Sequence, residues 1–204
     1  MSRLAIDSEK PATRLPTSNA LYEENRDEVW DGVLVMSPIA NNEHQQLTSR
    51  LGFAFQLVLG WNSRAKIFPG INLSDRVEGW QENYRIPDIA VYLPENTAID
   101  CETHWCGGPD FGVEIVSDDD RSLEKLPFYA KVNTQELLIV DRDPWCLSLY
   151  RLQDNEMVLV GKSSLEDSLE LVSAVLPLSF RLIPGDSRPA IEVTSSDKTQ
   201  RWEV

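Results

Sequence analysis

The chain has 204 residues, of which 42% are hydrophobic and 25% are charged, and this length suits a single domain. Such a composition is that of an ordinary globular protein and excludes a wholly disordered or collagen-like chain. Its 33 acidic and 19 basic residues give a net charge of −14, which works against a large non-specific DNA-binding surface but leaves room for a small basic groove or a divalent-metal site.

Both ends of the chain are polar. Residues 1–18 predict a loose N-terminal arm, with no apolar stretch of the kind that a secretory signal requires. Residues 185–204 predict a polar and poorly packed tail. A single folded domain is therefore expected over residues 19–184. The chain contains no apolar run long enough for a membrane-spanning helix, so no membrane association is expected.

The first part of this domain predicts a strand, a loop and a helix. Residues 29–36 are rich in β-forming side chains and are interrupted only by Gly32. Asn42, with Gln45 three residues later, has the spacing of a capping box. Apolar residues then recur at helical intervals, and Gly60 is a typical helix end.

Further along, the period changes from helical to alternating. Residues 87–93 and 111–116 have the patterns of strands. A second helix follows and extends to about residue 132. Because proline is tolerated only in the first turn of a helix, Pro127 places the start of this helix near residues 121–123.

Strands dominate the rest of the chain. Residues 137–140 form a continuous apolar run, as in a strand buried on both faces. Residues 145–152, 157–160 and 178–183 predict further strands. The order of these elements predicts a mixed α/β or α+β fold, in which the helices pack on a central sheet.

The strands at 87–93 and 111–116 each carry a carboxylate. Asp88 lies at the head of the first strand and Glu114 in the middle of the second, on the sheet face opposite to Val113. A carboxylate in an apolar strand is costly to bury unless it is paired or bound to a cation. Glu114 therefore lies either in solvent at a strand edge or beside Asp88 in an acidic pair for Mg²⁺.

Lys125 falls in the first turn of the helix that follows the Glu114 strand. A strand–turn–helix unit returns that turn toward the end of the strand. Lys125 is therefore either a solvated surface lysine or a third member of the pocket that holds Asp88 and Glu114. Two carboxylates and an ammonium suit metal-assisted phosphodiester cleavage, in which the metal activates water and the lysine stabilises developing charge.

Four segments of the chain together resemble the Uma-two (Uma2) family of restriction-endonuclease-like proteins, and an opening that runs from Glu28 to His44 resembles that family too. The resemblance covers about residues 22–152, and the four segments are residues 84–91, 108–117, 124–130 and 136–141. It implies the PD-(D/E)xK nuclease fold, with a central mixed β-sheet flanked by helices and here extended by extra strands.

The resemblance also implies the residues of a metal site. Asp88 matches the motif aspartate of the family and Glu114 matches its second acid, which makes both of them ligands of Mg²⁺ or Mn²⁺. The lysine of the usual motif would fall at Val116. Lys125, on the next helix, takes its place.

Two upstream residues match the family as well. Glu28 corresponds to a glutamate that completes the site, and His44 to a histidine near the start of the first helix. His44 also falls on the apolar stripe of that helix, so it is equally well interpreted as a hydrogen-bonded core histidine. The family usually has Ser-Pro after its second acid, whereas here Ser117 is followed by three aspartates at 118–120, which add negative charge near the expected site.

Sulfur and nitrogen donors are gathered in one later segment. Cys101, His104 and Cys106, with or without Cys146, could ligate zinc. Their spacing matches no usual structural-zinc pattern, however, and loop residues are expected instead. The cysteines are odd in number. Without a secretory signal, they predict reduced thiols in a cytoplasmic protein.

These observations predict an endonuclease that uses Mg²⁺ or Mn²⁺ to hydrolyse phosphodiester bonds of nucleic acid. The alternative is a non-enzymatic oligomeric or interaction protein on the same fold, because a fold does not establish a function. Residues 145–152 and 157–160 are expected to supply apolar strand edges. They predict a homodimer with Trp145 near its contact.

Overall fold

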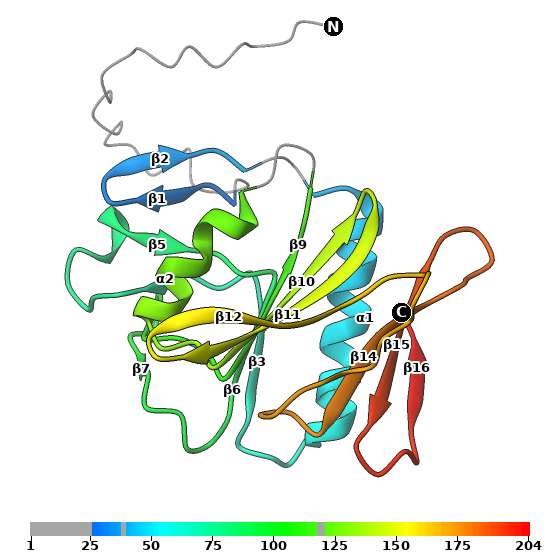
Figure 1. Cartoon of the computed structure of the whole chain (residues 1–204). Coiled ribbons are helices and arrows are strands. Elements are labelled where there is room, and N and C mark those ends of the chain that lie inside the picture. Colours follow the sequence, from blue (N-terminus) through cyan, green and yellow to red (C-terminus); the bar gives the residue numbers. More distant parts are fainter. Residues whose placement is uncertain (1–25, 38–39, 118–120) are drawn as a thin grey trace, which may run out of the picture.

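The computed structural model describes residues 26–37, 40–117 and 121–204. Its strands form three sheets, and the two α-helices of the described residues pack on the central one (Figure 1). The arm expected at residues 1–18 lies outside the described residues. Neither helix in the described ranges is long and apolar enough to cross a membrane.

The central sheet contains the strands that carry the two carboxylates. Its six strands lie in the order β12-β11-β10-β9-β6-β3, with β9 parallel to β10 and every other neighbouring pair antiparallel. The expectation of a central mixed sheet is therefore confirmed. The strands are β3 (Lys66–Pro69), β6 (Ile89–Tyr92), β9 (Phe111–Ile115), β10 (Glu136–Arg142), β11 (Trp145–Gln153) and β12 (Glu156–Ser163).

Alternation along β9 divides the core into two layers. Phe111 and Val113 pack on the side of α1 (Asn42–Leu59), in one cluster of buried apolar residues. Leu137 and Ile139 of the neighbouring strand pack on the other side, with residues of α2 (Leu126–Lys131). Glu114 consequently points toward α2, as the period of two predicts.

The N-cap of helix α1 lies one residue earlier than the sequence predicts. Asn41, not Asn42, is the N-cap, because its backbone is extended and its side chain accepts a hydrogen bond from the His44 N–H at 2.9 Å. Gly60 ends the helix as predicted. Its φ of 83° lies in the region that favours glycine, and its N–H donates to the Gln56 carbonyl.

The second helix has a 3₁₀ turn at its start. The turn η2 (Ser122–Lys125) leads directly into α2, and Pro127 lies at the first positions of the α-helix, where its missing N–H costs nothing. The predicted start near residues 121–123 therefore corresponds to the 3₁₀ turn. Lys125 is the last residue of that turn.

A second six-stranded sheet, in the order β2-β1-β5-β4-β8-β7, lies beside α2. The single strand predicted at residues 29–36 is a hairpin of β1 and β2, which turns at Asp31 and Gly32 with φ values of 47° and 84°. The strands are β1 (Glu28–Trp30), β2 (Val33–Val35), β4 (Leu73–Ser74), β5 (Tyr84–Arg85), β7 (Ile99–Asp100) and β8 (Trp105–Cys106).

The C-terminal part of the chain forms a third sheet, so the prediction of a poorly packed tail at residues 185–204 is wrong. Ile191 and Val193 are fully buried in the same apolar cluster as α1. Their polar neighbour Glu192 is paired with Arg181 and Arg201. The strands are β13 (Leu171–Val172), β14 (Leu178–Ile183), β15 (Ala190–Ser195) and β16 (Arg201–Glu203).

The strand at residues 145–152 does not supply a free edge, contrary to expectation. As β11 it lies between β10 and β12, because a tight turn at Asp154 and Asn155 folds β12 back onto it. Trp145 is half-buried, with the Arg188 guanidinium 5.2 Å from its ring centroid. The free edge belongs to β12.

Candidate active site

All five candidate residues predicted from the sequence line one small cavity of about 40 Å³. They come from β1, α1, the residue just before β6, β9 and η2, and none of them is more than 8% exposed. The residues are Glu28, His44, Asp88, Glu114 and Lys125. The interpretations of Glu114 and Lys125 as solvated surface residues are therefore wrong.

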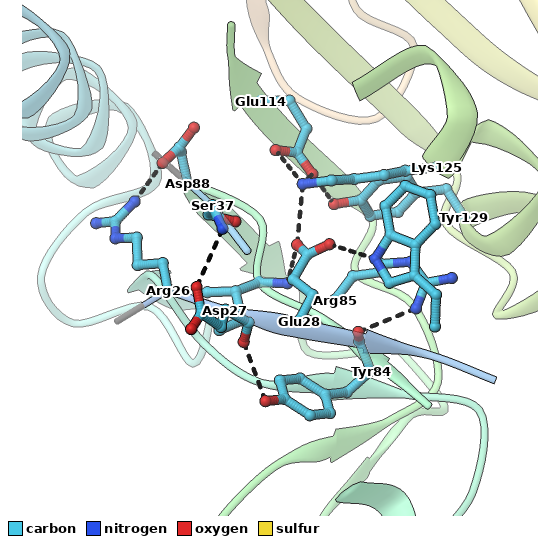
Figure 2. A network of polar contacts seen from close by, with 12 residues as sticks. Arg26, Asp27, Glu28, Ser37, Tyr84, Arg85, Asp88, Glu114, Lys125 and Tyr129 are labelled. Carbon is cyan, nitrogen blue, oxygen red and sulfur yellow. Dashed lines mark hydrogen bonds and ion pairs between the residues drawn. The ribbon is translucent and has the colours of Figure 1, made fainter. Parts of the chain in front are cut away.

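Lys125 lies between two carboxylates (Figure 2). Its ammonium is 2.9 Å from Glu28 Oε1 and 3.1 Å from each carboxylate oxygen of Glu114. The 3₁₀ turn η2 makes this possible, since it returns the chain toward the end of β9 eleven residues after Glu114. One cation is thus shared by two buried acids.

Asp88 is held by donors from three elements. Its Oδ1 accepts from Arg26 and lies 2.6 Å from His44 Nε2, and its Oδ2 accepts from the Ile115 N–H at 2.8 Å. His44 Nδ1 lies 3.2 Å from the Ser117 hydroxyl. His44 therefore satisfies both of the interpretations offered for it, since it is buried on the inward side of α1 and also contacts the site.

Glu28 is fixed from its own side of the cavity. The Ile86 N–H donates to its Oε1 at 2.8 Å and the Trp30 indole donates to its Oε2 at 2.7 Å. The guanidinium of Arg85 lies between the rings of Trp30 and Phe128, 4.4 and 4.3 Å from their centroids. Burial lowers the pKa of Arg85.

Two residues of the site were missed by sequence reasoning. The Tyr129 hydroxyl donates to Glu114, and Arg26 donates to Asp88. Tyr129 follows Lys125 by four residues, a spacing that brings side chains together on a helix, so the signal for it was present. Arg26 precedes the first predicted strand, and nothing in the sequence pattern links it to Asp88, 62 residues away.

Most of the chain matches a known protein family. The pattern of the Uma2 family, described as "Putative restriction endonuclease", matches residues 13–182. This chain belongs to the Uma2 family. The search of curated proteins found no match.

One solved structure has a fold similar to that of this Uma2 chain. It is the crystal structure of a "putative nuclease belonging to DUF820" from Anabaena variabilis ATCC 29413, with a TM-score of 0.56 and 20% sequence identity. The match covers 74% of the Uma2 chain and 83% of the other chain. This likeness shows that the two proteins share a fold.

Two other carboxylates and one ammonium affect the ionisation of Glu114 in the Uma2 site. Burial raises the pKa of Glu114, the ammonium of Lys125 lowers it, and the charges of Glu28 and Asp88 raise it further, to about 8. Burial and the neighbouring Glu114 also hold the pKa of Tyr129 well above its usual range. The net effect of these surroundings is to disfavour the ionised form of Glu114.

The carboxylate oxygens of the site are of the type that binds a divalent metal ion. Carboxylate oxygens are the ligands that Mg²⁺ and Mn²⁺ prefer. Within the described ranges, however, no three side chains of Asp, Glu, His or Cys already surround one metal position. A metal ion would have to displace donors that these acids already contact, Arg26 at Asp88 and Lys125 at Glu114.

The segment with cysteines does not form a zinc site in the described part of the chain. His104 is buried, its Nε2 lies 3.1 Å from the Arg76 carbonyl, and its ring stacks on Trp80. Cys101 and Cys106 are free thiols. His104 is thus a packed and hydrogen-bonded residue of the second sheet.

Proposed function

We propose that this Uma2 protein is an endonuclease that uses Mg²⁺ or Mn²⁺ to hydrolyse phosphodiester bonds of nucleic acid. The observation that carries the proposal is the convergence of Asp88, Glu114 and Lys125 in one buried cavity from separate parts of the chain. Membership of a family described as "Putative restriction endonuclease" supports it. The fold that the chain shares with a DUF820 protein agrees with it.

Five residues of the cavity have roles in this proposal. Asp88 and Glu114 hold the metal ion, which when bound supplies a Lewis acid and an activated water. Lys125 stabilises the negative charge that develops on the phosphate. Glu28 positions the Lys125 ammonium from the side opposite Glu114, and His44 orients Asp88.

A second candidate function is a non-enzymatic interaction protein that keeps the same cluster for stability. It is favoured by the observation that protein donors already satisfy each acid. Arg26 and His44 contact Asp88, while Lys125 contacts both glutamates. Buried ion pairs of this kind fix a structure without any catalytic role.

A cleavage assay separates the two functions. Purified protein is incubated with single- and double-stranded DNA and RNA in Mg²⁺, in Mn²⁺ and in EDTA. Metal-dependent cleavage is expected in the wild type, with losses of at least about 100-fold in Asp88→Asn, Glu114→Gln and Lys125→Met.

Glu136→Gln is the matched control for these variants. Glu136 is also a fully buried carboxylate in the central sheet, but it pairs with Arg151 at 2.7 Å, outside the cavity. This variant is expected to retain cleavage. Folded wild-type protein that cleaves none of the four substrates, or site variants as active as Glu136→Gln, would support the non-enzymatic function.

A further inference from the structure

A second hollow opens beside the cavity, and we refer to it as the α1 groove. It has a volume of about 600 Å³ and lies between α1 and β3. One wall consists of α1 residues at positions 45, 48, 49, 52, 53 and 56, whose spacing of three and four places them on one helix face. This face lies next to the buried stripe of the same helix.

The lining of the α1 groove differs from the rest of this acidic protein. None of the described residues that line it is Asp or Glu, although the chain has 33 of these and only 19 Lys and Arg. Phe53 is 56% exposed and Trp61 is 73% exposed. They are the two aromatic side chains among the strongly exposed large apolar residues of the described ranges.

These side chains suit the bases of nucleic acid. Aromatic rings such as those of Phe53 and Trp61 stack on the faces of unpaired bases, without regard to sequence. The amides of Gln45 and Gln56, which also line the groove, provide donors and acceptors for base edges. The groove lacks the row of cations that would follow the backbone of a duplex.

Gly52 leaves space in the middle of this wall. Glycine weakens a helix interior relative to alanine, so a packing reason is expected for it. The structure offers none, because a Cβ atom at Gly52 would meet nothing within 4 Å. The space that the missing side chain leaves belongs to the groove.

The α1 groove adjoins the candidate active site. Arg26 lines both hollows and donates to Asp88. Gln45, at the near end of the groove, is adjacent in sequence to His44 of the cavity. From there to its end at Leu59 the helix rises by about 21 Å, and Trp61 follows two residues later, which leaves room for several nucleotides.

We propose that the α1 groove binds a single-stranded segment of nucleic acid. Unpaired bases stack on Phe53 and Trp61, and the backbone passes Arg26 to reach Asp88. This inference rests on the proposed nuclease function and deepens it, because it names single strands or unpaired ends as the substrate class. A continuous duplex does not present the faces of its bases to such a groove.

The first test is binding without cleavage. A fluorescein-labelled 12-nucleotide single strand is titrated with the full chain in EDTA, and fluorescence anisotropy gives the dissociation constant. The single strand is expected to bind at least about tenfold more tightly than the duplex of the same sequence. Phe53→Ala and Trp61→Ala should each weaken single-strand binding by about fivefold or more.

Two further variants separate loss of the groove from loss of the fold. Gly52→Leu fills the open space with a good helix former, so it should raise the melting temperature while it weakens oligonucleotide binding. Leu57→Ala is the matched control, because Leu57 is an exposed apolar residue of α1 that does not line the groove. It should bind as the wild type does.

The outcomes for the groove and for the active site are distinguishable. The groove is rejected if the duplex binds as tightly as the single strand, or if Phe53→Ala and Trp61→Ala bind like Leu57→Ala. Cleavage that persists unchanged in these variants would reject the groove and retain the site. Groove-dependent binding without any cleavage in Mn²⁺ would retain the groove and reject the proposed nuclease.

Discussion

Lys125 lies between two carboxylates that would otherwise repel each other across a buried cavity. Its position at the end of a 3₁₀ turn brings one ammonium within 3.1 Å of both Glu28 and Glu114. Removal of such a cation leaves unpaired buried acids, which is costly. The side chain proposed to stabilise the phosphate is therefore also a structural cross-link between β9 and β1.

Glu114 should make the stability of the metal-free protein depend on pH. Its pKa is raised to about 8 in the folded protein, above the usual 4.5. The folded state therefore holds the proton more tightly. The resulting stabilisation is complete below pH 4.5 and is lost as the pH rises from 4.5 to 8, by at most about 1.4 kcal/mol per pH unit.

The measurement is urea unfolding in EDTA at several pH values, for wild type and for Glu114→Gln. The variant lacks this titration, so the stability of the wild type relative to the variant should fall between pH 5 and pH 8. A difference in unfolding free energy that stays constant over this range would show that Glu114 titrates normally.

Arg26 should compete with the metal ion for Asp88. Its side chain is 31% exposed, and such a partly exposed ion pair is worth up to about 1 kcal/mol. We therefore expect Arg26→Met to tighten Mn²⁺ binding by up to about fivefold, as measured by titration calorimetry. Arg201→Met, which removes an exposed partner of Glu192, is the control. Unchanged or weaker Mn²⁺ binding in Arg26→Met contradicts the competition.

The start of α1 allows a direct test of Asn41 as the N-cap. Asn41→Ala removes the acceptor of the His44 N–H and should lower the unfolding free energy by about 1 kcal/mol. Asn42→Ala changes the first helical residue and should have a much smaller effect. Thermal unfolding of the two variants, side by side, would identify Asn42 as the cap if their effects were reversed.

The elements that the sequence predicts well are those with a long and regular pattern. Helix α1 buries residues at a helical period, and strands β9 and β10 are segments with five consecutive buried residues, so the type of each element could be predicted. The convergence of Asp88, Glu114 and Lys125 could be anticipated from strand and helix geometry together with a family resemblance.

Other features depend on tertiary contacts that no local pattern records. Strands of two residues, such as β4 and β5, have no period and form only because neighbouring strands pair with them. Strand β15 could not be predicted from its sequence because it contains the charged residue Glu192. In the folded chain this carboxylate is paired with Arg181 and Arg201. The contact of Arg26 with Asp88 likewise exists only in the folded chain.

The exposed edge of the central sheet favours a homodimer. Strand β12 ends the sheet and exposes Val158, Leu159 and Val160. Free apolar edges pair readily with a second chain, and symmetric dimers are the commonest assemblies. We expect light scattering at tens of micromolar protein to give the mass of a dimer, and Leu159→Lys to give that of a monomer. A monomeric wild type at this concentration would be incompatible with the dimer.

The cavity also has a consequence for how the protein acquires activity. Asp88 meets Arg26 across 62 residues, and Glu28 accepts from Ile86 across 58. Contacts so distant in sequence form late, because the entropy of closing long loops must first be overcome. A partly folded or still growing chain thus has no assembled site, and the potential to cut nucleic acid arises only when folding is complete.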